Sequence, residues 1–243
     1  VYSGNVQKWC KFANSLKLRL AIRIAYANPS KAKEMAESAV KQEMGLIESN
    51  EDNAKWNYFG TLPNPIYTAV RYNEEKTGGD THAAADIICY MNGYDDNRRA
   101  SYFEKSKWEE QAYVGLRRSI NLAKMGDYFS NYSTIKMKSS DPVLWMNAAE
   151  VAFLRAEGKA IFNFDMGGEA GNFYNQGIRL SFEQWGAAGA DNYMEDAISK
   201  PATYKDPSGV YTYEGTLSEI TVKWDEAATP AEKQERIITQ KWI

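Results

Sequence analysis

Residues 141–186 read DPVLWMNAAEVAFLRAEGKAIFNFDMGGEAGNFYNQGIRLSFEQWG, and this stretch predicts two consecutive helices. The first is expected to open at Asp141-Pro142 and to run to about Asn163, with Trp145 and a row of alanines on one face. In the second, large apolar side chains recur at nearly four-residue steps until Gly186 ends the pattern. The glycine-rich link between them follows no strand and lacks a Gly-Lys-Ser/Thr ending, so it predicts a helix connection rather than a phosphate-binding loop.

Further helix signals flank this stretch on both sides. Apolar residues recur at helical spacing over Gln7–Ala27, and Asn28-Pro29 then opens a second helix that Gly45 ends. Near the end of the chain, Thr229 and Glu232 form a capping box that opens another helix. Small, alanine-rich stripes let neighbouring helices approach closely, so we expect a mainly α fold built from helix pairs.

The segments between these helices predict long irregular loops. Residues 50–81 show no sustained period and are rich in aromatic residues, and we expect a long loop there. A short helix is expected over Ala83–Asn92, and a mixture of loops and short strands over Ser101–Ile135. Residues 187–228 carry prolines and a short alternating run, which allows at most one or two short hairpins in the chain.

Composition excludes several classes of function. A net charge of -3 gives no long-range attraction for nucleic acid or an anionic membrane. One histidine, His82, and two cysteines, Cys10 and Cys89, are too few for a His/Cys zinc site, and we expect small buried thiols and a solvated His82. Asp95, Asp96 and Asn97 lack the spacing of a calcium loop, so no metal site is predicted. Seven Trp, 16 Tyr and nine Phe instead give an excess of flat rings with polar edges.

Four segments, taken in order along the chain, together resemble the SusD/RagB family of surface lipoproteins for nutrient uptake. They are Trp9–Ala21, Glu150–Glu157, Tyr174–Trp185 and Ile237–Trp242. The resemblance implies an α-α superhelix of tetratricopeptide-like helix pairs and a loop-rich part that binds the ligand. We therefore expect one SusD-like domain over residues 1–243, with its scaffold at about 7–45, 141–186 and 229–243 and its ligand-binding part at about 46–140 and 187–228.

The resemblance also implies a role and a location. Family members are held at the outer membrane by a lipidated N-terminal cysteine, face outward, and capture oligosaccharide beside a SusC-like TonB-dependent transporter. No catalysis and no cofactor are implied. Cys10 lies within a helical pattern with no signal sequence before it, so it is not that anchor. The last helix stops at Ile243 and the anchor is absent, so we expect a fragment that lacks the N-terminal part and the C-terminal end.

If the ligand is a glycan, the aromatic excess supplies rings on which the C–H face of a sugar can stack, while amide groups bind its hydroxyls. Regularly spaced helix aromatics predict core packing, which assigns Trp9, Phe12, Trp145, Phe182 and Trp185 to the scaffold. Loop residues are the better candidates, with Trp56 and Tyr58 first because they lie near two asparagines. The predicted ligand-binding residues are Trp56, Asn57, Tyr58, Asn64, Tyr67, Tyr72, Tyr102 and Trp108.

Two other functions stay open on the sequence alone. One is a protein-interaction lid that docks on the transporter and carries peptide or another non-sugar nutrient. The other, more distant, is a glycoside hydrolase. Glu150 and Glu157 lie seven residues apart on one expected helix, about 10 Å at 1.5 Å per residue, which fits an inverting carboxylate pair poorly. We expect both to be ion-paired with neighbours such as Arg155, and no catalytic residue is predicted.

Overall fold

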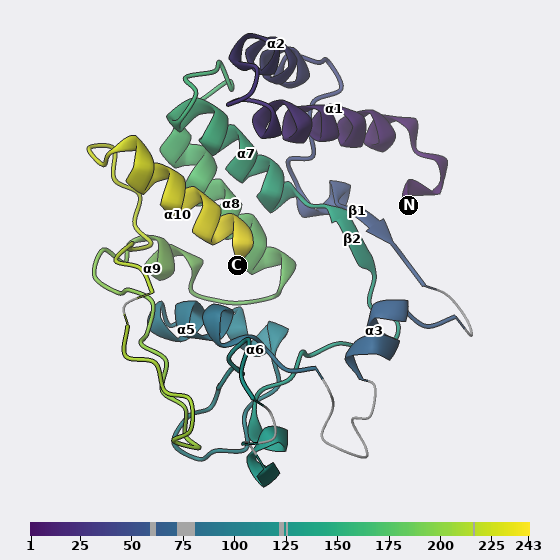
Figure 1. Cartoon of the computed structure of the whole chain (residues 1–243). Helices are drawn as coiled ribbons and strands as arrows, with labels where there is room; N and C mark the ends of the chain where they lie inside the picture. The colour runs from purple at the N-terminus through teal and green to yellow at the C-terminus, as the bar shows by residue number, and fades with distance from the viewer. Residues whose placement is uncertain (59–61, 72–80, 122–123, 125, 216) are drawn as a thin grey trace. The chain divides into compact units, whose positions relative to one another are not determined.

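The computed structural model describes residues 1–58, 62–71, 81–121, 124, 126–215 and 217–243 (Figure 1). The chain forms two compact units. Unit 1 comprises Val1–Asn57, Val143–Glu195 and Lys223–Ile243, and unit 2 comprises Tyr58–Pro142 and Asp196–Val222. Tyr72, one of the predicted ligand-binding residues, lies outside the described residues.

Unit 1 is built from helix pairs, which confirms the predicted fold class. Helix α1 packs against α2, α7 packs against α8, and α10 lies across α7 and α8 (Figure 1). Two short 3-10 turns, η1 and η2, and one two-stranded sheet complete the unit. The helices are α1 (Val6–Arg23), α2 (Pro29–Val40), α7 (Ala148–Ala160), α8 (Ala170–Gln184), α9 (Ala190–Met194) and α10 (Pro230–Trp242), and the turns are Tyr2–Gly4 and Asn50–Asp52.

Side-chain caps start these helices where the sequence supplies them. The Asn28 side chain accepts a hydrogen bond from the Lys31 backbone at 3.1 Å, and Pro29 occupies the first turn of α2. Thr229 and Glu232 form the predicted capping box at the start of α10. Gly186 follows α8 with a φ of 62°, a left-handed conformation that glycine adopts without strain and that ends the helix.

The close approach of α7 and α8 depends on one glycine. A Cβ atom on Gly177 would lie 2.6 Å from Cε1 of Phe153, whose side chain is buried in the core of unit 1. Phe153 also contacts Tyr174 edge-on, with ring centroids 6.0 Å apart. The absence of a side chain at position 177 therefore makes room for the Phe153 ring between the two helices.

A short antiparallel sheet lies where the sequence predicted the start of a helix and part of a long loop. Strands β1 (Ala54–Trp56) and β2 (Val143–Met146) pair with Trp56 opposite Val143 and Lys55 opposite Leu144. The prediction that a helix opens at Asp141-Pro142 is wrong, because residues 143–146 form β2 and the helix begins at Ala148 under an Asn147 cap. The prediction of one continuous loop over residues 50–81 is wrong as well, because η2, β1 and α3 lie within it.

Unit 2 contains short helices joined by long connections. Isolated bridges join Ala84 to Leu116 and Phe103 to Ile135. No strand forms over the described residues 187–215 and 217–228, so the hairpin allowed there is not present. The helical segments are α3 (Pro65–Val70), α5 (Ala85–Gly93), α6 (Arg99–Tyr102) and the 3-10 segment η4 (Gly126–Asn131).

The charged turn after α5 is a buried structural element. The side chains of Asp96 and Arg98 are both 0% exposed and form an ion pair. The Asp96 carboxylate also accepts a hydrogen bond from the Arg98 backbone N–H at 2.9 Å. Among the described residues, no group of three or more His, Cys, Asp or Glu side chains is placed to hold a metal ion.

Unit 2 consists of two chain segments, residues 58–142 and 196–222, which we call excursions. Each excursion leaves and rejoins unit 1 next to residues that are paired with each other. Trp56 and Val143, which border residues 58–142, are partners in the sheet. Glu195 and Lys223, which border residues 196–222, form an ion pair at 2.8 Å. In the part of the chain that the structure describes, no helix combines the length and the apolar character needed to cross a membrane.

Candidate ligand-binding surface

An aromatic row runs across unit 1 from η1 to the two-stranded sheet. Each ring contacts the next, with centroids 5.4 Å apart for Tyr2 and Trp9, 5.9 Å for Trp9 and Phe12, and 6.4 Å for Phe12 and Trp145. Trp145 in turn stacks on Trp56, with centroids 5.8 Å apart and planes 15° from parallel. We call these five residues the aromatic row.

The Trp56–Trp145 pair is the most exposed part of the aromatic row. Trp56 is 46% exposed and Trp145 is 42% exposed, although each is in contact with the other ring. Trp56 lies opposite Val143, and the register shifts between Ala54, opposite Met146, and Lys55, opposite Leu144, so Trp145 is the extra residue of a bulge in β2. The pairing of β1 with β2 therefore holds two indole rings parallel at the surface.

This arrangement corrects part of the assignment of aromatic residues to packing. Trp9 is 39% exposed, so placing Trp9 and Trp145 in the core on the basis of helical spacing is wrong. Trp185 is also exposed, whereas Phe182 is buried as predicted. Val143–Met146 is a short continuous apolar run, which is consistent with a buried strand but does not separate a strand from the helix that follows.

Polar contacts beneath the aromatic row fix its backbone. Arg19 donates two hydrogen bonds to Glu150, at 2.7 and 2.6 Å, and a third to the backbone carbonyl of Trp145 at 3.0 Å. The Tyr2 hydroxyl donates to the Asp52 carbonyl at 2.6 Å. Burial, together with the nearby Asp52 carboxylate, raises the pKa of Tyr2 to about 12, so its hydroxyl stays protonated at neutral pH.

The two carboxylates considered for hydrolysis are both engaged in ion pairs. Glu150 binds Arg19 and Glu157 binds Lys241, in each case with an N–O distance of 2.6 Å. The prediction of ion pairing is confirmed, although Arg155 pairs with Glu48 rather than with either of them. The surface near the aromatic row thus offers flat rings and paired charges, which suit binding rather than acid–base chemistry.

The predicted residues around α3 have different environments. Asn57 is exposed, and Tyr58 and Tyr67 are half-buried. Asn64 is fully buried: its side chain accepts from the Ile66 N–H and donates to the Asp141 carbonyl, both at 2.8 Å. The prediction of Asn64 as a ligand contact is therefore corrected, because its amide caps α3 and ties it to residue 141.

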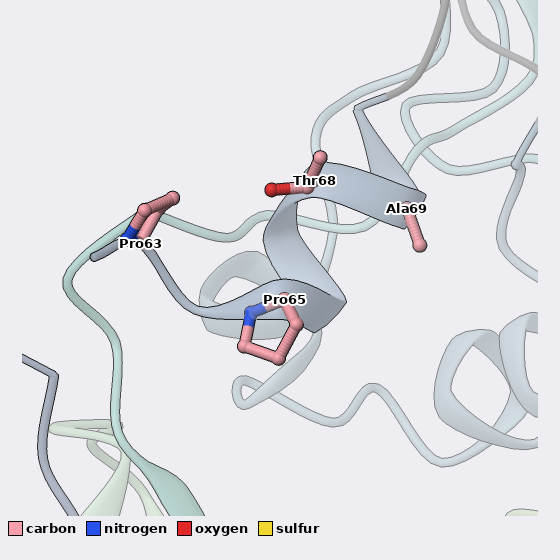
Figure 2. A pocket seen from close by; sticks show the side chains of 4 residues that line it. All are labelled: Pro63, Pro65, Thr68 and Ala69. Atoms are coloured by element: carbon pink, nitrogen blue, oxygen red, sulfur yellow. The ribbon is translucent and has the colours of Figure 1, made fainter.

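A shallow hollow of about 610 Å³ lies beside α3. It is lined by Pro63, Pro65, Thr68 and Ala69, and Figure 2 shows Pro63 on the segment that leads into the helix and the other three on the helix itself. The lining is mostly apolar and includes one hydroxyl group, on Thr68. This hollow has too few polar groups to orient a ligand by itself.

The remaining predicted residues contribute to packing within unit 2. Trp108 contacts Tyr132 edge-on at 4.8 Å, in a cluster around Val114 and Tyr132. Tyr102, on α6, contacts Phe103 edge-on at 6.0 Å. His82 belongs to the same region and packs on Phe129 with centroids 4.3 Å apart, so the expectation of a solvated His82 is wrong. Tyr102 thus lies on α6 and Trp108 on the connection that follows it, whereas Asn64 caps α3 and Tyr67 lies on that helix.

Both cysteines have free thiols. Cys89 is buried on α5, which confirms the prediction of a small buried thiol there, whereas Cys10 on α1 is only half-buried. Burial, with a smaller contribution from the Asp86 carboxylate, raises the pKa of the Cys89 thiol to about 11. This thiol is therefore protonated and unreactive at neutral pH.

Comparison with known proteins gives a consistent result over the whole chain. A family model described as Susd and RagB outer membrane lipoprotein matches residues 1–243. A crystal structure of a SusD homolog from Bacteroides uniformis is 73% identical, with a TM-score of 0.97 over 100% of this chain and 50% of that one. No curated protein matches the chain.

Two further solved structures extend the comparison. A SusD homolog from Bacteroides thetaiotaomicron is 45% identical with a TM-score of 0.89, over 100% of this chain and 49% of that one. A SusD homolog from Flavobacterium johnsoniae that is described as chitin-binding is 38% identical, with a TM-score of 0.87 over 99% of this chain and 48% of its own. The chain therefore spans about half the length of the solved relatives that it matches.

Proposed function

Because this chain belongs to the SusD/RagB family of outer membrane lipoproteins, we propose that it is part of a cell-surface receptor that captures oligosaccharide and passes it to a SusC-like TonB-dependent transporter. One relative that covers nearly the same residues is described as chitin-binding, which supports a glycan as ligand. The proposed role is binding and delivery, with no catalytic step.

The observation that carries the proposal is the exposed, parallel pair formed by Trp56 and Trp145. A pyranose ring presents a face of C–H groups that packs on an indole ring, and because Trp56 and Trp145 stack on each other, each would offer a sugar unit the face turned away from its partner. Such a surface is preformed, because the strand pairing and the Arg19 contacts to Glu150 and Trp145 fix the backbone without a ligand. We propose Trp56 and Trp145 as the primary glycan platform, with Asn57 as a neighbouring contact in the same unit, and we keep Tyr58, the first residue of unit 2, as a separate predicted contact.

The other predicted residues have smaller parts in the proposal. Tyr67 lies on α3, the helix that lines the hollow, and is kept as a predicted contact within unit 2. Tyr102 and Trp108 support the loops rather than the ligand. Tyr72 is kept as a predicted contact that only mutagenesis can test.

The test begins with a glycan array on the whole protein, followed by calorimetry with the oligosaccharide that binds best. Trp56→Ala and Trp145→Ala should each weaken binding by about 5- to 30-fold, since an aromatic stacking contact contributes about 1–2 kcal/mol. Trp185→Ala is the matched control, because Trp185 is 40% exposed in the same unit but is not in the aromatic row. Its glycan affinity should equal that of the wild type.

Four results would refute parts of this proposal. Unchanged binding in Trp56→Ala and Trp145→Ala would refute the platform, and an equal loss in Trp185→Ala would point to a general structural effect. Retained association with the transporter in a protein that binds no glycan would favour the interaction lid that carries peptide or another non-sugar nutrient. Turnover of any glycoside would favour the hydrolase.

A further inference from the structure

A cavity of about 500 Å³ lies within unit 2, separate from the aromatic row of unit 1. Its buried side is formed by Ala85 and Cys89 of α5 and by Tyr204, which pack together as a small core cluster. Its open side is formed by Arg117, Arg118 and Tyr213. The volume is in the range of small-molecule sites, and the lining combines an apolar floor with a charged rim.

The first rim group, Arg117, is held in place by contacts with Tyr211 and Tyr213. Its Nη1 atom donates to the Tyr211 carbonyl at 3.0 Å, and its Cζ atom lies 5.3 Å from the centroid of the Tyr213 ring. A guanidinium carries five N–H donors in a planar fork, more than one carbonyl can accept. Arg117 is therefore positioned at the cavity with its charge and its hydrogen-bonding plane fixed.

The second rim group, Arg118, reaches the same cavity because of a tight turn. In extended backbone, consecutive side chains would point in opposite directions. Here Ser119 has a φ of 58°, a left-handed conformation that is costly for a residue other than glycine and that is found preferentially at functional sites. Arg118 is 77% exposed, and its Nε atom donates to Asp86, which also lines the cavity, at 2.9 Å.

The charges of this rim favour an anionic ligand. Two guanidinium groups face one carboxylate, that of Asp86, in a chain whose net charge is -3. Arginine binds carboxylates through two parallel hydrogen bonds, which adds geometric selectivity to the charge interaction. Tyr213, which is 43% exposed, provides aromatic surface next to this charge for the C–H face of a sugar ring, and the buried Tyr204 closes the floor of the cavity.

We propose that this cavity is a second saccharide site that selects a sugar unit bearing a carboxylate group, such as a uronic acid. Arg117 binds the carboxylate, Arg118 contributes positive charge at the entrance, and the tyrosine surface accepts the ring. The site is carried by observations in unit 2 alone and does not depend on the Trp56–Trp145 platform.

The test compares methyl β-D-glucuronide with methyl β-D-glucoside, two probes that differ at the carboxylate, by ligand-observed NMR titration of the whole protein. We expect the glucuronide to bind at least ten-fold more tightly, with an affinity that falls as salt is raised. Arg117→Gln should abolish this preference, and Arg118→Gln, a change at an exposed residue, should reduce it several-fold. The control Arg179→Gln removes another exposed arginine, one that pairs with Asp191 in unit 1, and should leave the preference intact.

Equal binding of the two probes to the wild type, or no binding of either, would overturn the proposal. A full glucuronide preference in both of the single variants, Arg117→Gln and Arg118→Gln, would also overturn the proposal. Trp56→Ala distinguishes this site from the proposed glycan platform: it should weaken oligosaccharide binding and leave the glucuronide titration unchanged. A loss of glucuronide binding in Trp56→Ala would assign the acidic sugar to the platform and overturn the second site.

Discussion

Replacing Asp96 by Asn should destabilise unit 2 far more than breaking an exposed ion pair destabilises unit 1. The Asp96 carboxylate accepts hydrogen bonds from the Arg98 backbone N–H and from Nε of its guanidinium, at 2.9 and 3.0 Å, and both side chains are completely buried. The variant keeps the shape of the side chain but removes its charge. The guanidinium of Arg98 is then left without its counter-charge in the interior.

The size of this effect follows from burial. Removing one partner of a buried ion pair costs about 3–5 kcal/mol, because the remaining charge stays desolvated. In the exposed pair of Arg179 and Asp191, both groups are largely hydrated, and such pairs contribute about 0–1 kcal/mol. We therefore expect a loss of at least about 3 kcal/mol for Asp96→Asn and of less than about 1 kcal/mol for the control Asp191→Asn.

A site-specific probe can assign the loss to unit 2. Trp108 is the only tryptophan of the sequence within residues 58–142 and 196–222, so its resonance in 5-fluorotryptophan-labelled protein reports on that unit. Urea unfolding followed at this resonance should show a lower midpoint with an unchanged slope. A loss below about 1 kcal/mol, or one equal to that of Asp191→Asn, would refute the structural role of the buried pair. A stabilising effect of Ca²⁺ that Asp96→Asn removes would refute it in favour of a metal site.

Three further predictions concern packing, a thiol and a helix cap. Gly177→Ala should destabilise unit 1 by about 1–2 kcal/mol in urea unfolding despite the better helix propensity of alanine, and the additional change Phe153→Leu should restore part of the loss. Cys89 should react with iodoacetamide at pH 8 about 100-fold more slowly than an unhindered thiol, measured by mass spectrometry with the other cysteine replaced by serine, because its pKa is raised to about 11. The Thr229 hydroxyl and backbone N–H lower the pKa of Glu232 in the folded state, so the stabilisation of α10 by the capping box is complete above the unfolded-state pKa and is lost as the pH falls through the folded-state pKa. Glu232→Gln should remove that part of the acid dependence of thermal unfolding.

The helices of unit 1 could be predicted because their signals are local. Asn28-Pro29 and the Thr229 capping box fix helix starts within one turn, and Gly186 fixes a helix end. The strand at Val143–Met146 could not be predicted, because its partner β1 is far away in the sequence and its four residues merge with the helix pattern of Ala148–Ala160. Pairing between distant segments decided the structure there, over local periodicity.

The candidate site was predictable only in part for the same reason. Loop context drew attention to Trp56, which is exposed but lies on strand β1, and the ring that stacks on it is that of Trp145, which the spacing assigned to the core. Asn64 shows the opposite error: an amide beside aromatic residues suggests a ligand contact, yet its two hydrogen bonds are internal. The rim of Arg117 and Arg118 depends on a left-handed residue at Ser119, which no composition or motif signals.

Residues 58–142 and 196–222 leave and rejoin unit 1 at positions that are already in contact, through Trp56 with Val143 and through Glu195 with Lys223. For unit 1, each excursion is a loop whose closure entropy grows only with the logarithm of its length, about 0.6 kcal/mol for each doubling. Insertions and deletions inside either excursion therefore leave the helix pairs in place. Segments within residues 58–142 and 196–222 can therefore change in length or sequence while the helix pairs of unit 1 keep their packing.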